Sequence, residues 1–312
     1  MIIWDQVLKK LNNLENKIFN SKILLFGEFS ILNNLDALII PFSKFCGSLA
    51  FDNKIKTNES NVELSKYFKF LELNKFNNIL DLDNFKSDLD RNIYFESNIP
   101  IGYGLGSSGA LVAAVFDKYY RKKNNDLNEN NIFEMKKIMS KMENYFHGNS
   151  SGLDPLNSYF GKSIIVKSKK INTITFQTFN SNDYSFFLID TDIKKNTQKM
   201  VNIFKDKMKS QLFSNKIFND FNNLNKNCIQ SLIVNNIDLL NENFKNLSIF
   251  TFDYLNQMIP KNFIEIWSYG NQNNLFNLKL CGSGGGGYLL GFTKSLKQTK
   301  KVFKNYKLLE VF

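Results

Sequence analysis

The sequence predicts an α+β protein of two domains. Its 312 residues are enough for one large core, but two domains of roughly 150 residues are the more common solution at this length. Short apolar runs predict strands, whereas Leu and Phe recur at helical spacing in other stretches. A change of pattern near residue 180 predicts the boundary, with domains at 1–180 and 181–312.

The first predicted element is an amphipathic helix, whose apolar positions run from Trp4 to Ile18. Strand patterns follow at 22–29, 37–42 and 48–52. Residues 59–90 mix helix and loop, and residues 92–100 are extended. A helix then leads from a glycine turn through Tyr120, a polar turn covers 122–131, and a second helix covers 132–146.

The second half of the chain begins with strand patterns. Residues 161–170 and 171–179 predict paired strands, and residues 185–193 predict a buried strand that starts a new unit. Residues 197–258 are helical with polar interruptions. Two apolar runs then flank a glycine-rich stretch, and the chain returns to a strand pattern at 307–312.

Composition excludes several classes of protein. The net charge is +11, but the lysines are scattered beside abundant Asn, Ile and Phe, so we expect no nucleic-acid partner. No apolar run approaches the roughly 20 residues that a membrane helix needs. The three cysteines have no CxxC spacing and no secretory signal precedes them, which predicts reduced thiols in a cytoplasmic protein.

The segment PIGYGLGSSGALVAAVFDKYY, residues 100–120, joins a Gly/Ser-rich turn to an apolar helix. The unpaired N–H groups and the dipole at a helix N-terminus favour an anion, so the turn predicts a phosphate site. GLGSSG also fits the GxGxxG pattern of dinucleotide-binding oxidoreductases. That interpretation is disfavoured, because a second helix follows here instead of a strand ending in an acidic residue. An ordinary helix cap is the structural alternative.

Two carboxylates lie in ENYFHGNSSGLDP, residues 143–155. Glu143 and Asp154 flank a turn, and one of them could bind a divalent cation through oxygen while the other accepts a proton. An ordinary helix C-terminus is the alternative. His147 is the only histidine, which excludes a multi-histidine metal site.

CGSGGGG, residues 281–287, places five glycines in six residues between two strand patterns. A flexible linker is one interpretation of such a run. The flanking core-type strands favour a close approach of the backbone to a ligand or to the first glycine turn.

Together, in this order, these segments resemble the GHMP kinase superfamily of small-molecule kinases. The three motifs are KILLFGEFSIL (22–32), PIGYGLGSSGA (100–110) and KLCGSGGGGYLLGF (279–292). Within the superfamily, ENYFHGNSSGLD and DTDIKKNTQKMV (190–201) are similar to segments of the mevalonate kinases.

The resemblance implies an N-terminal domain like domain 2 of ribosomal protein S5 and a ferredoxin-like C-terminal domain. It also implies ATP-dependent phosphorylation of a small alcohol, with Mg²⁺, and mevalonate as the first choice of acceptor. Phosphomevalonate, homoserine and a sugar are the alternative acceptors, and a non-catalytic ligand-binding relative is the remote alternative. A homodimer is compatible with this reading.

By motif, the resemblance implies that Asp154 is the catalytic carboxylate beside Lys22, and that Ser108 and Glu143 hold Mg²⁺. The implied cofactor-binding residues form the first glycine turn: Pro100, Gly102, Gly104, Leu105, Gly106, Ser107, Ser108, Gly109 and Ala110. The implied substrate residues are Glu28, Phe29, His147, Ser151, Gly152, Thr197, Gly284 and Gly285.

One departure from the family pattern bears on the substrate. Phe29 stands where mevalonate kinases usually have histidine, and an aromatic ring cannot supply the hydrogen bonds of an imidazole. The resemblance therefore leaves the identity of the acceptor open.

Overall fold

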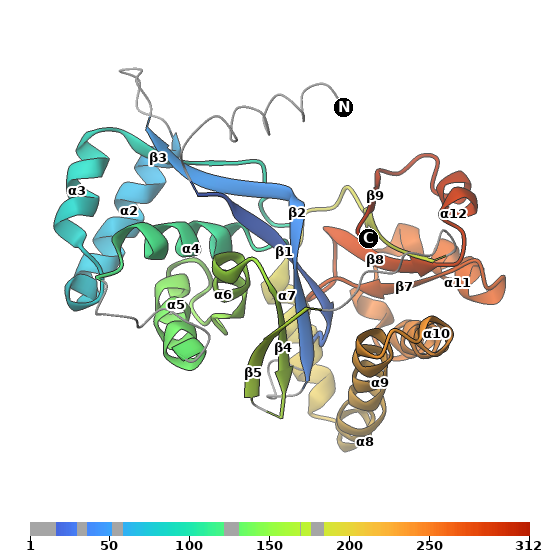
Figure 1. The fold of residues 1–312 in the computed structure, drawn as a ribbon. Coiled ribbons are helices and arrows are strands. Elements are labelled where there is room, and N and C mark those ends of the chain that lie inside the picture. The colour runs from blue at the N-terminus through green and yellow to red at the C-terminus, as the bar shows by residue number, and fades with distance from the viewer. Residues whose placement is uncertain (1–16, 30–35, 52–58, 122–130, 169, 176–183) are drawn as a thin grey trace. The chain divides into compact units, whose positions relative to one another are not determined.

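Figure 1 shows the fold of the computed structural model, which describes residues 17–29, 36–51, 59–121, 131–168, 170–175 and 184–312. The predicted N-terminal helix and the predicted boundary at 180 and 181 lie outside these residues. The chain forms two compact units. The first unit comprises residues 1–22, 40–100 and 105–163, and the second comprises 23–39, 101–104 and 164–312.

The first unit is built mainly of helices. β2 (Ala37–Phe51) enters it from the second unit, and its residues Gly47–Phe51 pair antiparallel with β3 (Ile93–Ser97). β1 (Phe19–Phe26) begins in this unit and is hydrogen-bonded to β2. The helices are α2 (Glu59–Leu73), the short η2 (Phe76–Asn78), α3 (Leu82–Asp90), α4 (Ser107–Tyr119), α5 (Ile132–His147) and α6 (Leu153–Phe160).

α4 is the central helix of the first unit. Its small and apolar residues, from Ala110 to Phe116, are almost all buried, because α4 packs against α5, α6 and α3. A helix that is apolar on nearly every side needs such neighbours. The start of α4 is thereby fixed in position, and the start of this helix is where the candidate site forms.

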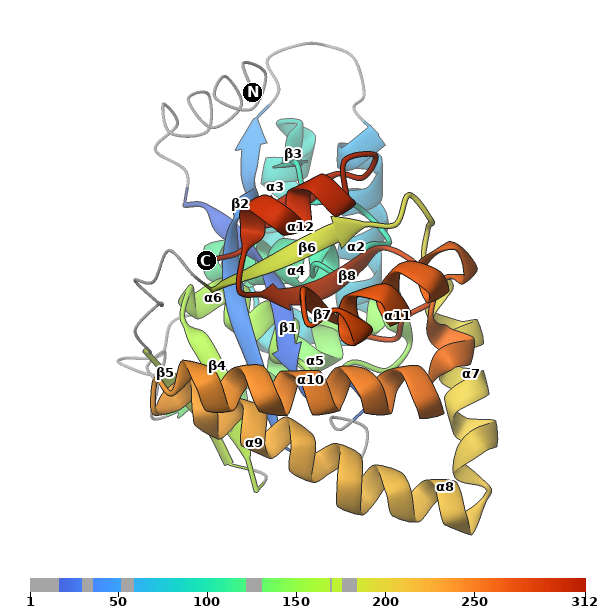
Figure 2. The same cartoon turned by 90° about the vertical axis from the view of Figure 1, so that its right-hand side faces the viewer.

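The second unit contains a four-stranded sheet and a group of helices, and Figure 2 shows them toward the viewer. The sheet has the order β7-β8-β6-β9, and its neighbouring strands are antiparallel. Its strands are β6 (Ser185–Asp190), β7 (Phe276–Leu280), β8 (Tyr288–Thr293) and β9 (Leu308–Glu310). β4 (Ser163–Lys167) pairs with residues 37–39 of β2 and is followed in the sheet by β5 (Lys170–Ile174).

The helices of the second unit lie between β6 and β7 and after β8. They are α7 (Thr197–Met208), α8 (Gln211–Asn215), the π-helical η4 (Lys216–Phe221), α9 (Asn222–Ile233), α10 (Ile237–Tyr254), η5 (Asn256–Met258), η6 (Lys261–Phe263), α11 (Ile264–Gln272) and α12 (Leu296–Val302). α10 and α11 pack on β7. The core between sheet and helices includes a cluster of buried aromatic rings with centroids 4.7–6.3 Å apart: Phe26, Phe186, Phe244 and Phe292.

The mixed α and β class predicted from the sequence is confirmed, as are the helices at 107–119 and 132–147. The strands predicted at 37–42 and 48–52 are one continuous strand, β2, because buried residues continue on both sides of the exposed pair Ser43 and Lys44. Cys46, Cys228 and Cys281 are free and buried. None of the described helices combines the length and the apolar character that a membrane-spanning helix requires. The two domain folds that the resemblance implies stay predictions.

Candidate functional site

The candidate site of the first unit centres on an ion pair between Lys22 and Asp154. Lys22 lies on β1, and Asp154 lies in the first turn of α6, which begins after Gly152. The Lys22 Nζ atom lies 3.0 Å from Oδ2 of Asp154, with 10% of the Lys22 side chain and 30% of the Asp154 side chain exposed. The lysine is therefore held within the unit, while the carboxylate keeps one side open to solvent.

The start of α4 packs tightly against this ion pair. The Lys22 N–H donates to the Leu105 carbonyl at 2.9 Å, and the next residue, Gly106, caps the helix with a φ of 75°. A Cβ atom on Gly106 would lie 2.8 Å from Cγ of Lys22, and one on Gly109 would lie 2.9 Å from Cβ of Asp154. Only glycine allows this approach, so the N–H groups of the first turn of α4 lie next to the Lys22 and Asp154 side chains.

Glu143 reaches the same helix start from α5. The Ser108 hydroxyl donates to Oε1 of Glu143 at 3.0 Å and lies 2.9 Å from Nε2 of His147, and the Ser150 hydroxyl donates to Oε2 of Glu143. The Glu143 side chain is buried, with 3% of the residue exposed. The two serines hold this carboxylate in one orientation at the first turn of α4.

The charges of the site influence one another. Burial, and to a smaller extent the nearby Asp154, raise the pKa of Glu143 to about 7 against the opposing effects of the Ser150 and Ser108 hydroxyls and Lys22. Burial lowers the pKa of His147 from its usual value, with Asp154 opposing this effect and Lys22 adding to it. The site thus combines an ionised pair with a carboxyl group that changes charge near neutral pH.

The donor set fits a hard divalent cation. Ser108 Oγ and Glu143 Oε1 are two oxygen ligands 3.0 Å apart, and Mg²⁺ binds such ligands together with water and substrate phosphates. A cation there would favour the ionised form of Glu143, which burial disfavours. Among the described residues, no group of three or more His, Cys, Asp or Glu side chains gathers as a metal site. Phosphate oxygens and water would therefore have to complete the coordination sphere.

Two further residues predicted for the site belong to the turn before α6. The Ser151 hydroxyl accepts from the Leu153 N–H at 3.3 Å, and Gly152, with a φ of 73°, donates its N–H to Ser150 Oγ at 3.0 Å. A Cβ atom on Gly152 would lie 2.4 Å from the Lys136 carbonyl oxygen. This turn therefore aims Asp154 at Lys22 and Ser150 at Glu143.

The predicted cofactor-binding residues are divided between the two units. Pro100 and residues 105–110 belong to the first, with Leu105 and Ala110 buried and Ser107 half-buried at the start of α4. Gly102 and Gly104 belong to the second unit, where they lie beside two lysines. A Cβ atom on Gly102 would lie 3.3 Å from Cε of Lys194, and one on Gly104 would lie 2.5 Å from Nζ of Lys195.

Lys194 and Lys195 were missed at the sequence level. Lys195 donates to the Cys281 carbonyl, and its ammonium group also lies near Gly282. The signal was two consecutive cations between a buried strand and the start of α7 at Thr197. These lysines add positive charge beside the glycines of the second unit.

The glycine run from Gly282 to Gly287 is held by hydrogen bonds of its backbone. The Gly285 N–H donates to the Met258 carbonyl and the Gly287 N–H to the Ile193 carbonyl, both at 2.7 Å, while Thr191 donates to the Gly287 carbonyl. Gly284 and Gly285 both have positive φ angles. The run is therefore an ordered loop of the second unit, which argues against the linker interpretation.

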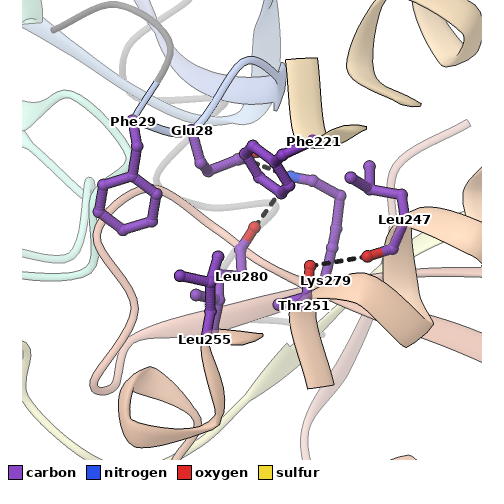
Figure 3. Close-up of a pocket in the computed structure, with 8 residues that line it drawn as sticks. All are labelled: Glu28, Phe29, Phe221, Leu247, Thr251, Leu255, Lys279 and Leu280. Carbon is purple, nitrogen blue, oxygen red and sulfur yellow. Dashed lines mark hydrogen bonds and ion pairs between the residues drawn. The ribbon is translucent and has the colours of Figure 1, made fainter. Parts of the chain in front are cut away.

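Glu28 forms a buried ion pair with Lys279, shown in Figure 3. Each side chain is 2% exposed, and Lys279 also donates to the Leu280 carbonyl at 2.8 Å. Burial raises the pKa of Glu28, and Lys279 opposes this. Oε2 of Glu28 has no hydrogen-bond partner among the described residues, and Glu28 is one of the residues that line a cavity of ≈ 10 Å³. That volume corresponds to about one water molecule. The predicted contact of Glu28 with a substrate stays a prediction.

Phe29 lies beside this pair in the second unit. Its ring stacks on Phe204 of α7, with centroids 4.2 Å apart and ring planes 13° apart, and 7% of the residue is exposed. Its φ of 61° is unusual for an aromatic residue. The stacked ring closes one side of the small cavity in Figure 3 and presents no polar atom.

We predict that breaking the buried pair is costly and that removing both charges is not. Lys279→Met leaves the Glu28 carboxylate buried without a counter-charge and should lower the free energy of unfolding by about 3–5 kcal/mol. The double variant Glu28→Gln/Lys279→Met should recover most of this loss, as measured by urea unfolding. Lys297→Met, an exposed change in the same unit, is the control. Equal loss in the single and double variants would contradict the pairing.

A second prediction concerns the pH dependence of the metal-free protein. The pKa of Glu143 is raised in the fold from 4.5 to about 7, so the folded protein binds this proton more tightly than the unfolded chain does. The resulting contribution to stability is fully present below pH 4.5 and is lost as pH rises through about 7. The free energy of unfolding should fall by up to about 3 kcal/mol over this range.

Urea unfolding in the presence of a chelator, at constant ionic strength, measures this slope. Glu143→Gln should flatten it, whereas Glu134→Gln, an exposed carboxyl on the same helix, should leave it unchanged. If the free energy of unfolding of Glu143→Gln changed with pH in parallel with that of the wild-type protein, burial of the Glu143 carboxyl would not be the cause of the pH dependence.

Comparison with known proteins connects this geometry to a family. Residues 71–162, which include α4, Glu143 and Asp154, match the family model of the GHMP kinases N-terminal domain. The mevalonate kinase of Archaeoglobus fulgidus is 24% identical over 283 residues, which cover 88% of this chain and 91% of that protein.

Solved structures share the fold. The mevalonate kinase of Methanococcus jannaschii matches with a TM-score of 0.61 and 19% identity, over 95% of this chain and 96% of that one. The phosphomevalonate kinase of Streptococcus pneumoniae matches with a TM-score of 0.60 and 15% identity, over 94% and 97%. Residues 71–162 of the chain are thus similar to the GHMP kinases N-terminal domain, and mevalonate kinases are among the proteins that the chain resembles.

Proposed function

We propose that this protein transfers the γ-phosphoryl group of ATP to the 5-hydroxyl of mevalonate and so forms 5-phosphomevalonate. The observation that carries the proposal is the Lys22–Asp154 pair, 3.0 Å apart, at the start of α4. The mevalonate kinases among the relatives support the choice of acceptor.

Asp154 is proposed to orient the acceptor hydroxyl and to receive its proton. Lys22 forms an ion pair with the Asp154 carboxylate and offsets the negative charge that develops on the transferring group. Phosphoryl transfer depends on positioning and charge neutralisation more than on covalent participation of the protein. A cation and a carboxylate side by side are suited to that task.

The first turn of α4 is proposed to bind the phosphates of ATP through its backbone N–H groups and the Ser107 and Ser108 hydroxyls. Ser108 and Glu143 would hold Mg²⁺, which when bound neutralises phosphate oxygens. Lys194 and Lys195 are additional candidates for anion contacts, because they lie beside Gly102 and Gly104. We also propose a cytoplasmic location, which the free thiols of Cys46, Cys228 and Cys281 support. The homodimer stays a prediction.

The choice of acceptor is tested by following ADP release with mevalonate, phosphomevalonate, homoserine and galactose. We expect mevalonate to be phosphorylated with the highest kcat/KM. Phosphomevalonate is the second candidate, because the buried, non-polar Phe29 ring departs from the mevalonate kinase pattern. If only phosphomevalonate is phosphorylated, the proposed substrate is wrong. If the folded protein phosphorylates none of the four acceptors, the proposed kinase activity is wrong.

The role of Asp154 is tested by substitution. Asp154→Asn should lower kcat of the folded protein by at least about 10²-fold, as expected for loss of a group that accepts a proton, with little change in nucleotide affinity. Asp83→Asn, an exposed acid on α3, is the control. A kcat near the wild-type value would assign proton transfer to another group.

A further inference from the structure

The first unit has a pocket that is larger than the cavity beside Glu28 in the second unit. None of the sequence motifs predicted it. It has a volume of ≈ 550 Å³ and lies between the end of α2, the η2 turn and α5, with this lining: Phe70, Asn74, Lys75, Phe76, Ile79, Lys141, Asn144 and Gly148. Small-molecule sites in proteins commonly have volumes of about 300–1,000 Å³. The pocket is therefore large enough for an organic ligand.

The lining has two kinds of surface. Phe70, Phe76 and Ile79 provide an apolar wall, and Lys75 and Lys141 contribute two ammonium groups. Neither of these lysines has an ion pair with another described residue, whereas Lys66 on α2 and Lys137 on α5 each pair with a glutamate one turn away. Two cations beside an apolar wall, with no ion-pair partner in the part of the chain that the structure describes, favour a ligand with an anionic group and an apolar body.

The amide side chains of the wall are already fixed. Asn74 donates through Nδ2 to the Phe70 carbonyl at 2.8 Å, and Asn144 accepts through Oδ1 from the Ser150 N–H at 2.8 Å. A Cβ atom built on Gly148 would meet nothing within 4 Å, so there is free space beside the backbone of the pocket lining at this residue.

One of these bonds connects the pocket to the candidate metal site. Ser150, whose N–H binds Asn144, also donates its hydroxyl to Glu143. Asn144 and Glu143 are consecutive residues of α5, so they project from different sides of the helix. A ligand that moves Asn144 therefore also moves a hydrogen-bond donor of Glu143.

We propose that this pocket is a regulatory site for a small organic anion, with a planar apolar body and one phosphate or carboxylate group. The anionic group binds Lys75 and Lys141, and the body packs on Phe70, Phe76 and Ile79. Occupancy changes nucleotide affinity through Asn144, Ser150 and Glu143. This coupling rests on the proposed function, whereas binding in the pocket does not.

Phenyl phosphate is the probe, and its binding to the full chain is measured by calorimetry with the nucleotide site saturated by Mg·ADP. Inorganic phosphate and benzyl alcohol test the anionic group and the apolar body separately, and both should bind more weakly. Lys75→Met and Lys141→Met should each weaken phenyl phosphate binding by at least about threefold. Lys137→Met, an exposed lysine on the same helix, should not.

The coupling is measured as the change in Mg·ADP affinity caused by saturating phenyl phosphate. We expect a change of about fivefold in the wild-type protein, whereas Lys141→Met should need at least about threefold more phenyl phosphate to reach it. The same dependence on phenyl phosphate concentration in both proteins would show competition at the nucleotide site and would overturn the proposal, as would phenyl phosphate binding that is equal in all variants or absent. Neither measurement requires turnover, so failure of the kinase assay is a separate result.

Discussion

The first unit depends on the burial of charged side chains at the start of one helix. Lys22 and Glu143 are almost completely removed from water, and Asp154 is partly so. An ionised group in such surroundings is stable only with a counter-charge or hydrogen bonds in good geometry. Lys22 therefore pairs with Asp154, and two serine hydroxyls bind Glu143. The glycines at 106 and 109 leave the space that this arrangement needs.

The same constraint takes a different form in the second unit. Glu28 and Lys279 are buried more completely than Lys22 and Asp154, and the adjacent cavity has a volume of ≈ 10 Å³. Their role in the fold is to connect the turn after β1 to the end of β7, from which the ordered glycine run begins. The Asp154 carboxylate keeps a side exposed to solvent, as the proposed chemistry requires, whereas both members of the Glu28 pair are buried.

Much of the fold followed from the order of apolar residues. Helical spacing predicted α4 and α5 closely, and alternation or short apolar runs predicted most strands, because burial of one face or of a whole segment leaves that pattern. The two segments predicted on either side of Ser43 were merged into one strand, since local polarity interrupts a pattern without interrupting a hydrogen-bonded ladder. Lys194 and Lys195 were overlooked because consecutive lysines usually lie on solvated surfaces.

The sequence by itself determined the class of the fold, the position of the glycine turn before a helix, and the types of residue that phosphoryl transfer requires. Only the tertiary structure decided which charges meet. Lys22 and Asp154 are separated by more than a hundred residues, and so are Glu28 and Lys279. Spacing along the chain carries no information about such distances, because they are set by how strands and helices pack. The partner of each buried charge is therefore a property of the folded chain.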